Sequence, residues 1–121
     1  MTNIRLTIYT QDKGRLDLTQ EECHNFTLNT VTLHRTNSPA VIRYHKDGSI
    51  RCKLYYINDK LHRLDGPSII WYYQYVGVDR EYYFINNKFY KKEDYYNLIN
   101  EMKALPKTLK LVHEDWWVRE L

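Results

Sequence analysis

Two His-Arg pairs are the first candidates for chemistry in this sequence, because paired basic side chains can receive a phosphate group. The pairs are His34-Arg35 and His62-Arg63, which occupy the same position in two successive stretches of similar sequence. An alternative interpretation places each pair at a corner between strands, where the arginine binds loop carbonyls or the Asp65 carboxylate. Recurrence favours the structural role, since a residue needed once per structural unit is usually needed by the unit itself.

Neither a metal site nor a nucleophilic catalytic site is recognisable in the pattern of residues. The five histidines and two cysteines contain no Cys-x-x-Cys or His-x-x-x-His spacing. The serines and cysteines lack the strained turn and adjacent base that nucleophilic catalysis requires, and the four glycines are scattered. We therefore expect a protein that is not an enzyme and uses no cofactor. A composite site, such as His62 with Asp65 and a tyrosine, is the alternative left open.

Tyrosine supplies the strongest binding candidates. The chain contains 12 tyrosines, three tryptophans and three phenylalanines, so that 15% of its residues are aromatic. Because successive strand residues point to opposite faces of a sheet, half of the strand tyrosines should miss any single core. We interpret them as an aromatic binding patch, and the alternative is cross-strand pairing that only stabilises the sheet. The candidate patch consists of Tyr55, Tyr56, Trp71, Tyr72, Tyr73, Tyr82, Tyr83 and Trp117.

Positive charge is modest and lies mainly in the first half of the chain. The formal net charge is +3, which is weak compared with dedicated duplex-binding proteins. Single-stranded nucleic acid or a nucleotide could still stack its bases on tyrosines while basic side chains meet its phosphates. The candidate phosphate contacts are Arg35, Arg43, Lys46, Arg51, Lys53 and Arg63.

Length and hydropathy predict one soluble domain. A chain of 121 residues can bury one modest core, and no segment is long and apolar enough to cross a bilayer. The first residues lack the basic-then-apolar order of a signal peptide. Cys23 and Cys52 are expected to be free thiols. We therefore expect a cytoplasmic protein with no membrane partner.

A block of 28 residues occurs twice in tandem, at residues 33–60 and 61–88. Such a fixed period is typical of a protein built from tandem copies of one supersecondary unit. Each copy is predicted to be an antiparallel hairpin, with strands at residues 39–45 and 50–57 and again at 67–73 and 80–85. Asn58-Asp59 and Asn86-Asn87 tolerate the positive φ that tight turns require. Asp65, Gly66 and Pro67 form a further, structural turn.

The flanking segments complete the predicted fold. Residues 3–10 and 26–33 alternate as strands, and Thr19 to Glu22 resembles a capping box that starts a helical turn. Tyr95, Leu98, Ile99 and Met102 follow the spacing of an amphipathic helix that ends before Pro106. The predicted fold class is α+β: an antiparallel β-meander of tandem 28-residue hairpin repeats, closed by this C-terminal helix. The single domain, residues 1–121, divides into 1–32, the two repeats, and a helical segment at 91–121.

Residues 60–67, Lys-Leu-His-Arg-Leu-Asp-Gly-Pro, are followed by an apolar strand and then by Tyr-Tyr-Phe-Ile-Asn-Asn-Lys at 82–88. This order resembles a hairpin repeat of bacteriophage and giant-virus proteins, a variant of the membrane occupation and recognition nexus (MORN) repeat. The family form reads His-Arg-x-Asp-Gly-Pro-Ala, a strand, a turn, and an aromatic strand closing in Asn-Gly-Lys. The resemblance covers residues 33–92, although Thr36-Asn37-Ser38 departs from it and Asp59 and Asn87 replace the usual glycine.

These observations predict a non-catalytic protein-interaction module, because large rigid aromatic side chains bring contact area at low entropic cost. The resemblance implies a virus-encoded protein acting in the host-cell cytoplasm, with a host protein as partner. Its concrete form would be an inhibitor of a host defence or regulatory protein. The alternative is the single-stranded nucleic-acid or nucleotide binder, and sequestration of a small nucleotide between protomers is left open. A homo-oligomer is a further expectation, because an open meander exposes edge strands and nothing blunts the edge of the N-terminal one.

Overall fold

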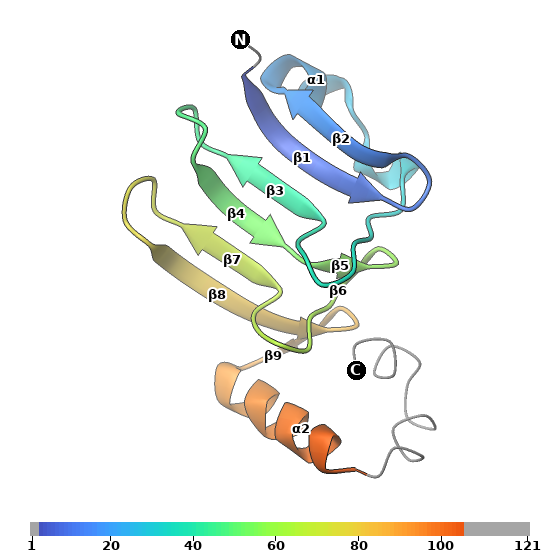
Figure 1. The fold of residues 1–121 in the computed structure, drawn as a ribbon, viewed down its shortest axis with the longest axis vertical. Helices are drawn as coiled ribbons and strands as arrows, with labels where there is room; N and C mark the ends of the chain where they lie inside the picture. The colour runs from blue at the N-terminus through green and yellow to red at the C-terminus, as the bar shows by residue number, and fades with distance from the viewer. Residues whose placement is uncertain (1–2, 106–121) are drawn as a thin grey trace.

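The structure, a computed structural model, describes residues 3–105, which form an open antiparallel sheet with one helix near each end (Figure 1). Seven strands of this region pair in the order β2-β1-β3-β4-β7-β8-β9, and β5 and β6 form a separate two-stranded ribbon. The predicted α+β class, with its antiparallel meander and C-terminal helix, is therefore confirmed. The elements are β1 Ile4–Thr10, β2 Gly14–Thr19, α1 Gln20–Asn25, a 3-10 turn Leu28–Thr30, β3 Val41–Tyr44, β4 Ile50–Leu54, β5 Tyr56–Ile57, β6 Lys60–Leu61, β7 Ile69–Tyr72, β8 Val78–Ile85, β9 Lys88–Tyr90 and α2 Lys92–Ala104.

Local sequence signals account for the turns and the helix starts. Thr19 caps α1 as predicted: its side chain accepts from the Glu22 backbone N–H, and the Glu22 carboxylate accepts from the Thr19 N–H. The turn residues Asn58, Asp59, Asn86 and Asn87 all adopt positive φ, between 49° and 68°. The short side chains of Asn and Asp tolerate this conformation, so the two predicted turns are confirmed.

The strand predicted at residues 26–33 is wrong. Strand β2, which was not predicted, pairs with β1 along the edge that this strand would have used. Residues 26–33 cross one face of the sheet instead, with a 3-10 turn and a single bridge between Thr10 and Leu33. Val31 and Leu33 are buried there, which explains the apolar alternation of this segment. Because β2 covers β1, the N-terminal strand is not an exposed edge.

The strand predicted at residues 50–57 is interrupted after Leu54. The Tyr55 backbone N–H donates to the Ser68 carbonyl at 2.8 Å, which continues the pairing with the next hairpin by one residue. The Tyr56 carbonyl then accepts from the Arg35 N–H at 3.1 Å. The chain thus leaves the main sheet at this point and forms the β5–β6 ribbon.

The described residues bury two hydrophobic clusters, on opposite faces of the sheet, rather than the single core expected. On one face, which we call the α1 face, Leu6, Ile8 and Val41 pack beneath α1 and residues 28–33. Register places Tyr82 on this same face, through the row Ile8, Val41, Leu54, Ile69 and Tyr82. Its neighbour Tyr83 therefore points to the other side, the α2 face, where it packs against α2.

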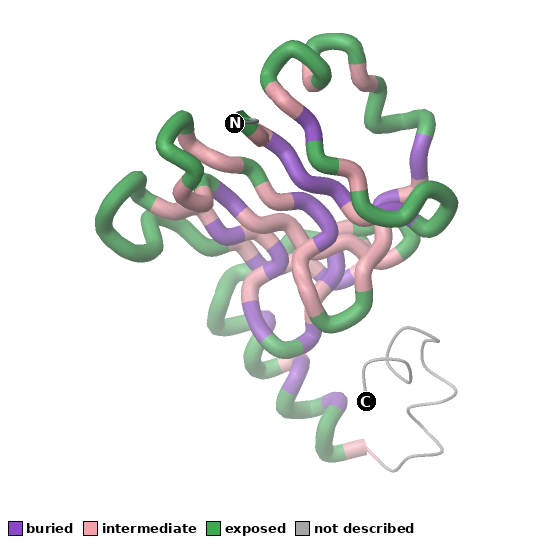
Figure 2. The backbone as a smooth tube through the Cα atoms, turned by 45° about the horizontal axis from the view of Figure 1, so that its top comes forward, coloured by how far each residue is buried: buried purple, intermediate pink, exposed green. Residues whose placement is uncertain are grey.

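Helix α2 covers only the end of its face. Tyr95, Ile99 and Met102 are buried as the helical spacing predicted, and they pack against Tyr83, Ile85 and Leu64. The helix contacts β8 and β9 and lies at that end of the sheet, so that the middle strands are left without a helical cover on this side (Figures 1 and 2). Residues 106–121, which include the predicted Trp117 and most of the second half of segment 91–121, lie outside the described residues.

Candidate functional site

The tyrosines predicted to form a binding patch are divided between the two faces, and Tyr83 is buried. Its exposed fraction is 4%, and its ring centroid lies 4.8 Å from that of Tyr95 on α2. Burial raises the pKa of the Tyr83 phenol to about 12. Tyr56 is half-buried beside the α1-face cluster, and burial raises the pKa of its phenol as well. Tyr82 is also half-buried.

Three further rings of the predicted patch lie beside cations of the protein itself. The Arg63 guanidinium carbon lies 4.0 Å from the Tyr55 ring centroid, and the Lys53 ammonium lies 5.5 Å from the Tyr72 ring. Trp71 has guanidinium groups at 5.8 and 5.9 Å, from Arg51 and Arg80. These cation–π contacts occupy ring surface that a base would use for stacking. Tyr73 alone among the predicted patch residues that the structure describes is largely exposed, at 56%.

The two His-Arg pairs make matching contacts at their corners. The Asn58 N–H donates to His34 Nδ1 at 3.0 Å, and the Asn86 N–H donates to His62 Nδ1 at 3.1 Å. Each arginine donates to the carbonyl of the proline four residues later: Arg35 to Pro39 at 3.3 Å, and Arg63 to Pro67 at 3.0 Å. The interpretation of these pairs as structural corner residues is therefore confirmed. These hydrogen bonds fix the orientation of each guanidinium at its corner but use only one or two of its five N–H donors.

The turn predicted at Asp65, Gly66 and Pro67 is joined to α2. The Asp65 carboxylate accepts from Arg63 Nε at 3.0 Å. Tyr95 donates its hydroxyl hydrogen to the Arg63 carbonyl at 2.6 Å and accepts from the Gly66 N–H at 3.2 Å. Burial raises the pKa of the Tyr95 phenol, which keeps it a neutral donor. The turn thus holds the helix in place.

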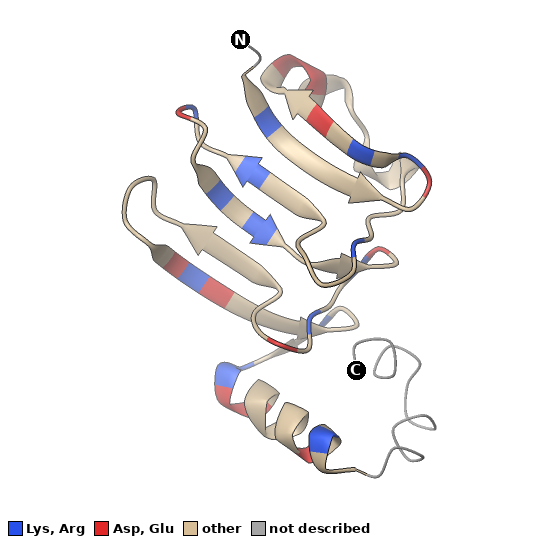
Figure 3. Cartoon of the chain, viewed as in Figure 1, with Lys and Arg blue, Asp and Glu red and all other residues tan. Residues whose placement is uncertain are grey.

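The remaining predicted phosphate contacts do not form one stripe. Arg43 and Arg51 are exposed on the α1 face, Lys53 lies on the α2 face, and Lys46 is exposed at the β3–β4 tip. Figure 3 shows basic segments on β1, β3 and β4 and none on β7. A nucleic-acid strand lying along either face would meet only part of this set.

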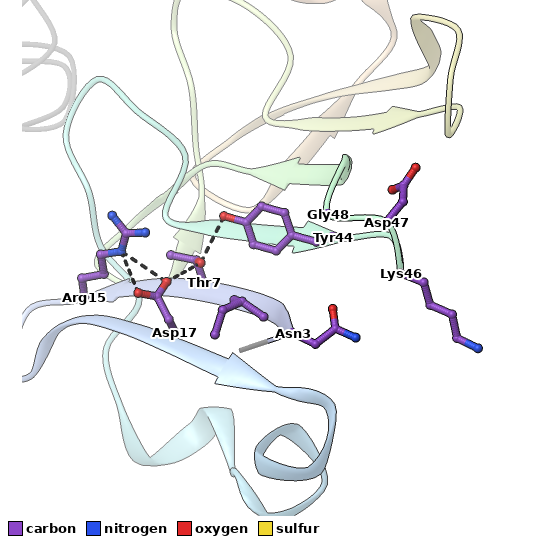
Figure 4. A pocket seen from close by; sticks show the side chains of 9 residues that line it. Asn3, Thr7, Arg15, Asp17, Tyr44, Lys46, Asp47 and Gly48 are labelled. Carbon is purple, nitrogen blue, oxygen red and sulfur yellow. Dashed lines mark hydrogen bonds and ion pairs between the residues drawn. The ribbon is translucent and has the colours of Figure 1, made fainter. Parts of the chain in front are cut away.

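A polar groove lies on the α2 face beside the N-terminal strands (Figure 4). Its side chains are bonded to one another: Thr7 Oγ1 donates to Asp17 at 2.6 Å and lies 3.1 Å from the Tyr44 hydroxyl, and Arg15 Nε pairs with Asp17 at 3.1 Å. Thr7, Asp17, Tyr44 and the Arg15 Nε of this groove therefore already have partners within the protein. Within residues 3–105 no group of three or more His, Cys, Asp or Glu side chains is placed to hold a metal ion.

Sequence reasoning named only Tyr73 of the most exposed apolar surface that the structure describes, the tip of the β7–β8 hairpin. Tyr75 is 80% exposed, Val76 74%, Tyr73 56% and Val78 48%. We call these four residues the apolar tip; Figure 2 shows the tip segment as exposed throughout. The signal was present in the sequence, since Tyr-Gln-Tyr-Val-Gly-Val stands at 73–78 where a turn calls for polar residues.

The equivalent tip of the β3–β4 hairpin is polar and closed by its own side chains. Asp47 accepts from both the N–H and the hydroxyl of Ser49, at 2.9 and 2.6 Å, and these hydrogen bonds lower the pKa of the Asp47 carboxyl. The backbone closes both tips with the same bond, from the His45 N–H to the Ser49 carbonyl at 2.8 Å and from the Tyr73 N–H to the Gly77 carbonyl at 3.0 Å. A hairpin of this kind thus forms without apolar residues at its tip.

No protein-family model, no curated protein and no solved structure matches this chain. In the described part of the chain, no helix has the length and apolar character needed to cross a bilayer. Function is therefore inferred from the side chains and their geometry.

Proposed function

We propose that the protein is a non-catalytic protein-interaction module and that the apolar tip is its contact surface. The observation that carries this proposal is the exposure of Tyr75 and Val76, at 80% and 74%, on a projecting hairpin. Burying a side chain of this kind in a partner is worth about 1.5–3 kcal/mol. Tyrosine is also a frequent anchor in protein interfaces.

Folding does not require apolar residues at the β7–β8 tip, so a binding role accounts for them better. An exposed apolar cluster favours aggregation, and the polar β3–β4 tip illustrates that the turn geometry does not require it. The charges beside the apolar tip compensate each other, since Arg80 Nε lies 3.5 Å from the Asp79 carboxylate. We therefore expect the binding site on the partner to be an apolar pocket that carries no strong net charge.

We also propose that the scaffold is two tandem copies of a 28-residue hairpin unit. The corner hydrogen bonds of His34 and Arg35, which recur at His62 and Arg63, support this. With the resemblance to hairpin proteins of phages and giant viruses, the partner is a host protein. The activity that follows is inhibition of a host defence or regulatory protein in the host-cell cytoplasm.

Affinity capture with a matched pair of variants tests the contact surface. The tagged wild type, the apolar-tip variant Tyr75→Ser/Val76→Ser and the polar-tip control Lys46→Ser/Asp47→Ser are each used to capture partners from host lysate. Any partner is then purified and its dissociation constant measured. We expect the apolar-tip variant to bind about 100-fold more weakly, which corresponds to about 3 kcal/mol, and the control to bind as the wild type does.

Stability measurements separate lost binding from lost folding. The apolar-tip variant should change the free energy of unfolding by no more than about 0.5 kcal/mol, because both positions are exposed. The control also loses the Asp47 hydrogen bonds to Ser49 and should cost about 1 kcal/mol. Equal affinity of wild type and apolar-tip variant for the purified partner would refute the assignment of the surface. Concentration-dependent self-association that the Tyr75→Ser/Val76→Ser variant abolishes would identify a second copy of the chain as the occupant instead.

A further inference from the structure

A second surface of different chemistry lies on the α1 face, between α1 and strands β1, β3 and β4. It is a groove of about 420 Å³. The polar and charged side chains that line it are Arg5, Arg43, Arg51, Gln20, His24 and Cys23. No aspartate or glutamate is among its lining residues. The apolar tip lies at the same end of the sheet, on the neighbouring hairpin, and none of its four residues lines the groove (Figure 1).

Two β-bulges gather the arginines of this groove on one side of the sheet. Leu6, Arg43 and Cys52 lie opposite one another in a single row and therefore share the α1 face. Strict alternation would turn Arg5 and Arg51, their neighbours in sequence, to the α2 face. Each instead occupies a register shift, between Ile4 and Leu6 in β1 and opposite the Arg43–Tyr44 step in β4. An extra residue in one strand redirects a side chain in this way.

Contacts confirm where the redirected side chains lie. The Arg51 guanidinium carbon lies 5.8 Å from the ring of Trp71, which pairs with Cys52 and so belongs to the α1 face. Arg5 and Arg43 both act electrostatically on the Cys23 thiol of α1. Since β1, β3 and β4 are consecutive neighbours, the Cα atoms of the three arginines fall within roughly 10 Å.

Within the described residues, none of the three guanidinium groups is held in an ion pair. The buried Nε of Arg5 has no hydrogen-bond partner among those residues. Glu22 also acts electrostatically on Cys23, and one of its carboxylate oxygens accepts from the Thr19 N–H, so its single negative charge can offset only one of the three cations. Burial raises the pKa of both Cys23 and Cys52, so these thiols remain neutral.

We propose that this groove binds a small phosphate-bearing anion, held by Arg5, Arg43 and Arg51. Guanidinium groups match the geometry of phosphate oxygens with paired hydrogen bonds, and a phosphate monoester carries about two negative charges at neutral pH. His24 and Gln20 add donors at the rim on α1. The inference goes beyond the protein-interaction function, because it uses another face and another chemistry.

Titration of the full chain with inorganic phosphate, pyrophosphate and AMP tests the site. Tryptophan fluorescence, to which Trp71 beside Arg51 contributes with two other tryptophans, follows occupancy, and calorimetry confirms the stoichiometry. We expect saturable one-to-one binding that weakens as salt rises. AMP binding at least about tenfold tighter than inorganic phosphate identifies a nucleotide as the source of the phosphate, and equal or weaker binding identifies the free anion. Absence of saturable binding of all three ligands up to about 10 mM overturns the proposal.

The matched hairpin offers a variant that the fold tolerates. Position 79, which stands in the equivalent bulge of β8, carries aspartate, so Arg51→Asp exchanges one bulge residue for the other. We expect Arg51→Asp and Arg43→Gln each to weaken phosphate binding at least about tenfold. Lys53→Gln, which removes a cation from the opposite face, should leave it unchanged within about twofold. Equal losses in all three variants would show non-specific attraction and refute the site, whereas the apolar-tip variant should bind phosphate as the wild type does.

Discussion

The two hairpins of this protein are built on the same frame and differ in what they expose. Each hairpin has a corner in which a histidine accepts from a turn N–H. Each also has a β-bulge at the equivalent position and the equivalent backbone hydrogen bond across its tip. Each of these contacts satisfies backbone groups that would otherwise lack partners. What recurs between the hairpins is therefore what the hairpin needs in order to form.

The differences lie at exposed positions. The bulge holds Arg51 in one hairpin and Asp79 in the other, and the tip is polar in one and apolar in the other. Neither difference changes the frame. Positions that diverge while the frame is kept are free to serve binding: the apolar tip belongs to the second hairpin only, and the first hairpin contributes Arg43 and Arg51 to the arginine groove, which β1 and α1 complete.

The largest effect is expected at Tyr95, because α2 is anchored to the second hairpin and has no counterpart at the first. Tyr95→Ala removes a fully buried ring and should lower the free energy of unfolding by about 3–5 kcal/mol. Tyr95→Phe keeps the ring but leaves the Gly66 N–H and the Arg63 carbonyl without their partner, at a cost of about 1–3 kcal/mol. Urea denaturation measures both. Wild-type stability of the Phe variant would mean that the hydroxyl does not fix the corner.

A matched pair of alanine substitutions compares the two corner turns. Gly66 has a φ of 155°, and a Cβ there would lie 3.0 Å from the Arg63 guanidinium carbon. Moving that guanidinium aside would disturb its hydrogen bonds to the Asp65 carboxylate and the Pro67 carbonyl. Gly66→Ala should therefore cost about 1–3 kcal/mol. Ser38, at the equivalent position, should accept alanine within about 0.5 kcal/mol in the same urea experiment. Equal costs would show that the corners are under the same constraint.

Much of the frame could be predicted from the sequence because it depends on local signals. The Asn58-Asp59 and Asn86-Asn87 turns and the capping box at Thr19 each depend on a few neighbouring residues, and each is present in the structure. The strand at 14–19 was missed although Leu16 and Leu18 alternate after a glycine turn. Residues 26–33 have a similar alternation, and only the tertiary structure decides which of the two segments pairs with β1.

The candidate sites were harder to predict, because they depend on which side chains the fold covers. Most of the tyrosines were correctly placed on strands, although Tyr55 and Tyr73 lie just outside them. The arginine or lysine beside a ring, such as Arg63 beside Tyr55, comes from a different strand or loop. The gathering of Arg5 with Arg51 results from bulges, which shift the face of a single residue and leave no mark in an alternating pattern. The apolar residues of the tip can be read from the sequence, but only the structure shows that they are exposed to solvent.

Alkaline pH should affect the second hairpin through Tyr83, whose phenol has a pKa of about 12 in the folded protein and about 10 when unfolded. The folded state therefore holds this proton more tightly. The stability it contributes is fully present below pH 10 and is lost as the pH rises from about 10 to 12. The free energy of unfolding, measured by denaturation at several pH values, should decrease across this range. Tyr83→Phe should reduce the slope, and a slope unaltered by this substitution would contradict the assignment.

The smallest effect is expected from exchanging the residues of the two tight turns. Asp59 and Asn87 have φ values of 67° and 68°, and their side-chain oxygens accept from the Leu33 and Leu61 N–H groups at 2.6 and 2.7 Å. Because both residues have the same backbone conformation and accept the same kind of hydrogen bond, Asp59→Asn and Asn87→Asp should each change the free energy of unfolding by less than about 0.5 kcal/mol. Asp59→Gly keeps the backbone conformation but loses the acceptor, and should cost about 1 kcal/mol. A glycine variant as stable as the wild type would show that conformation alone selects these residues.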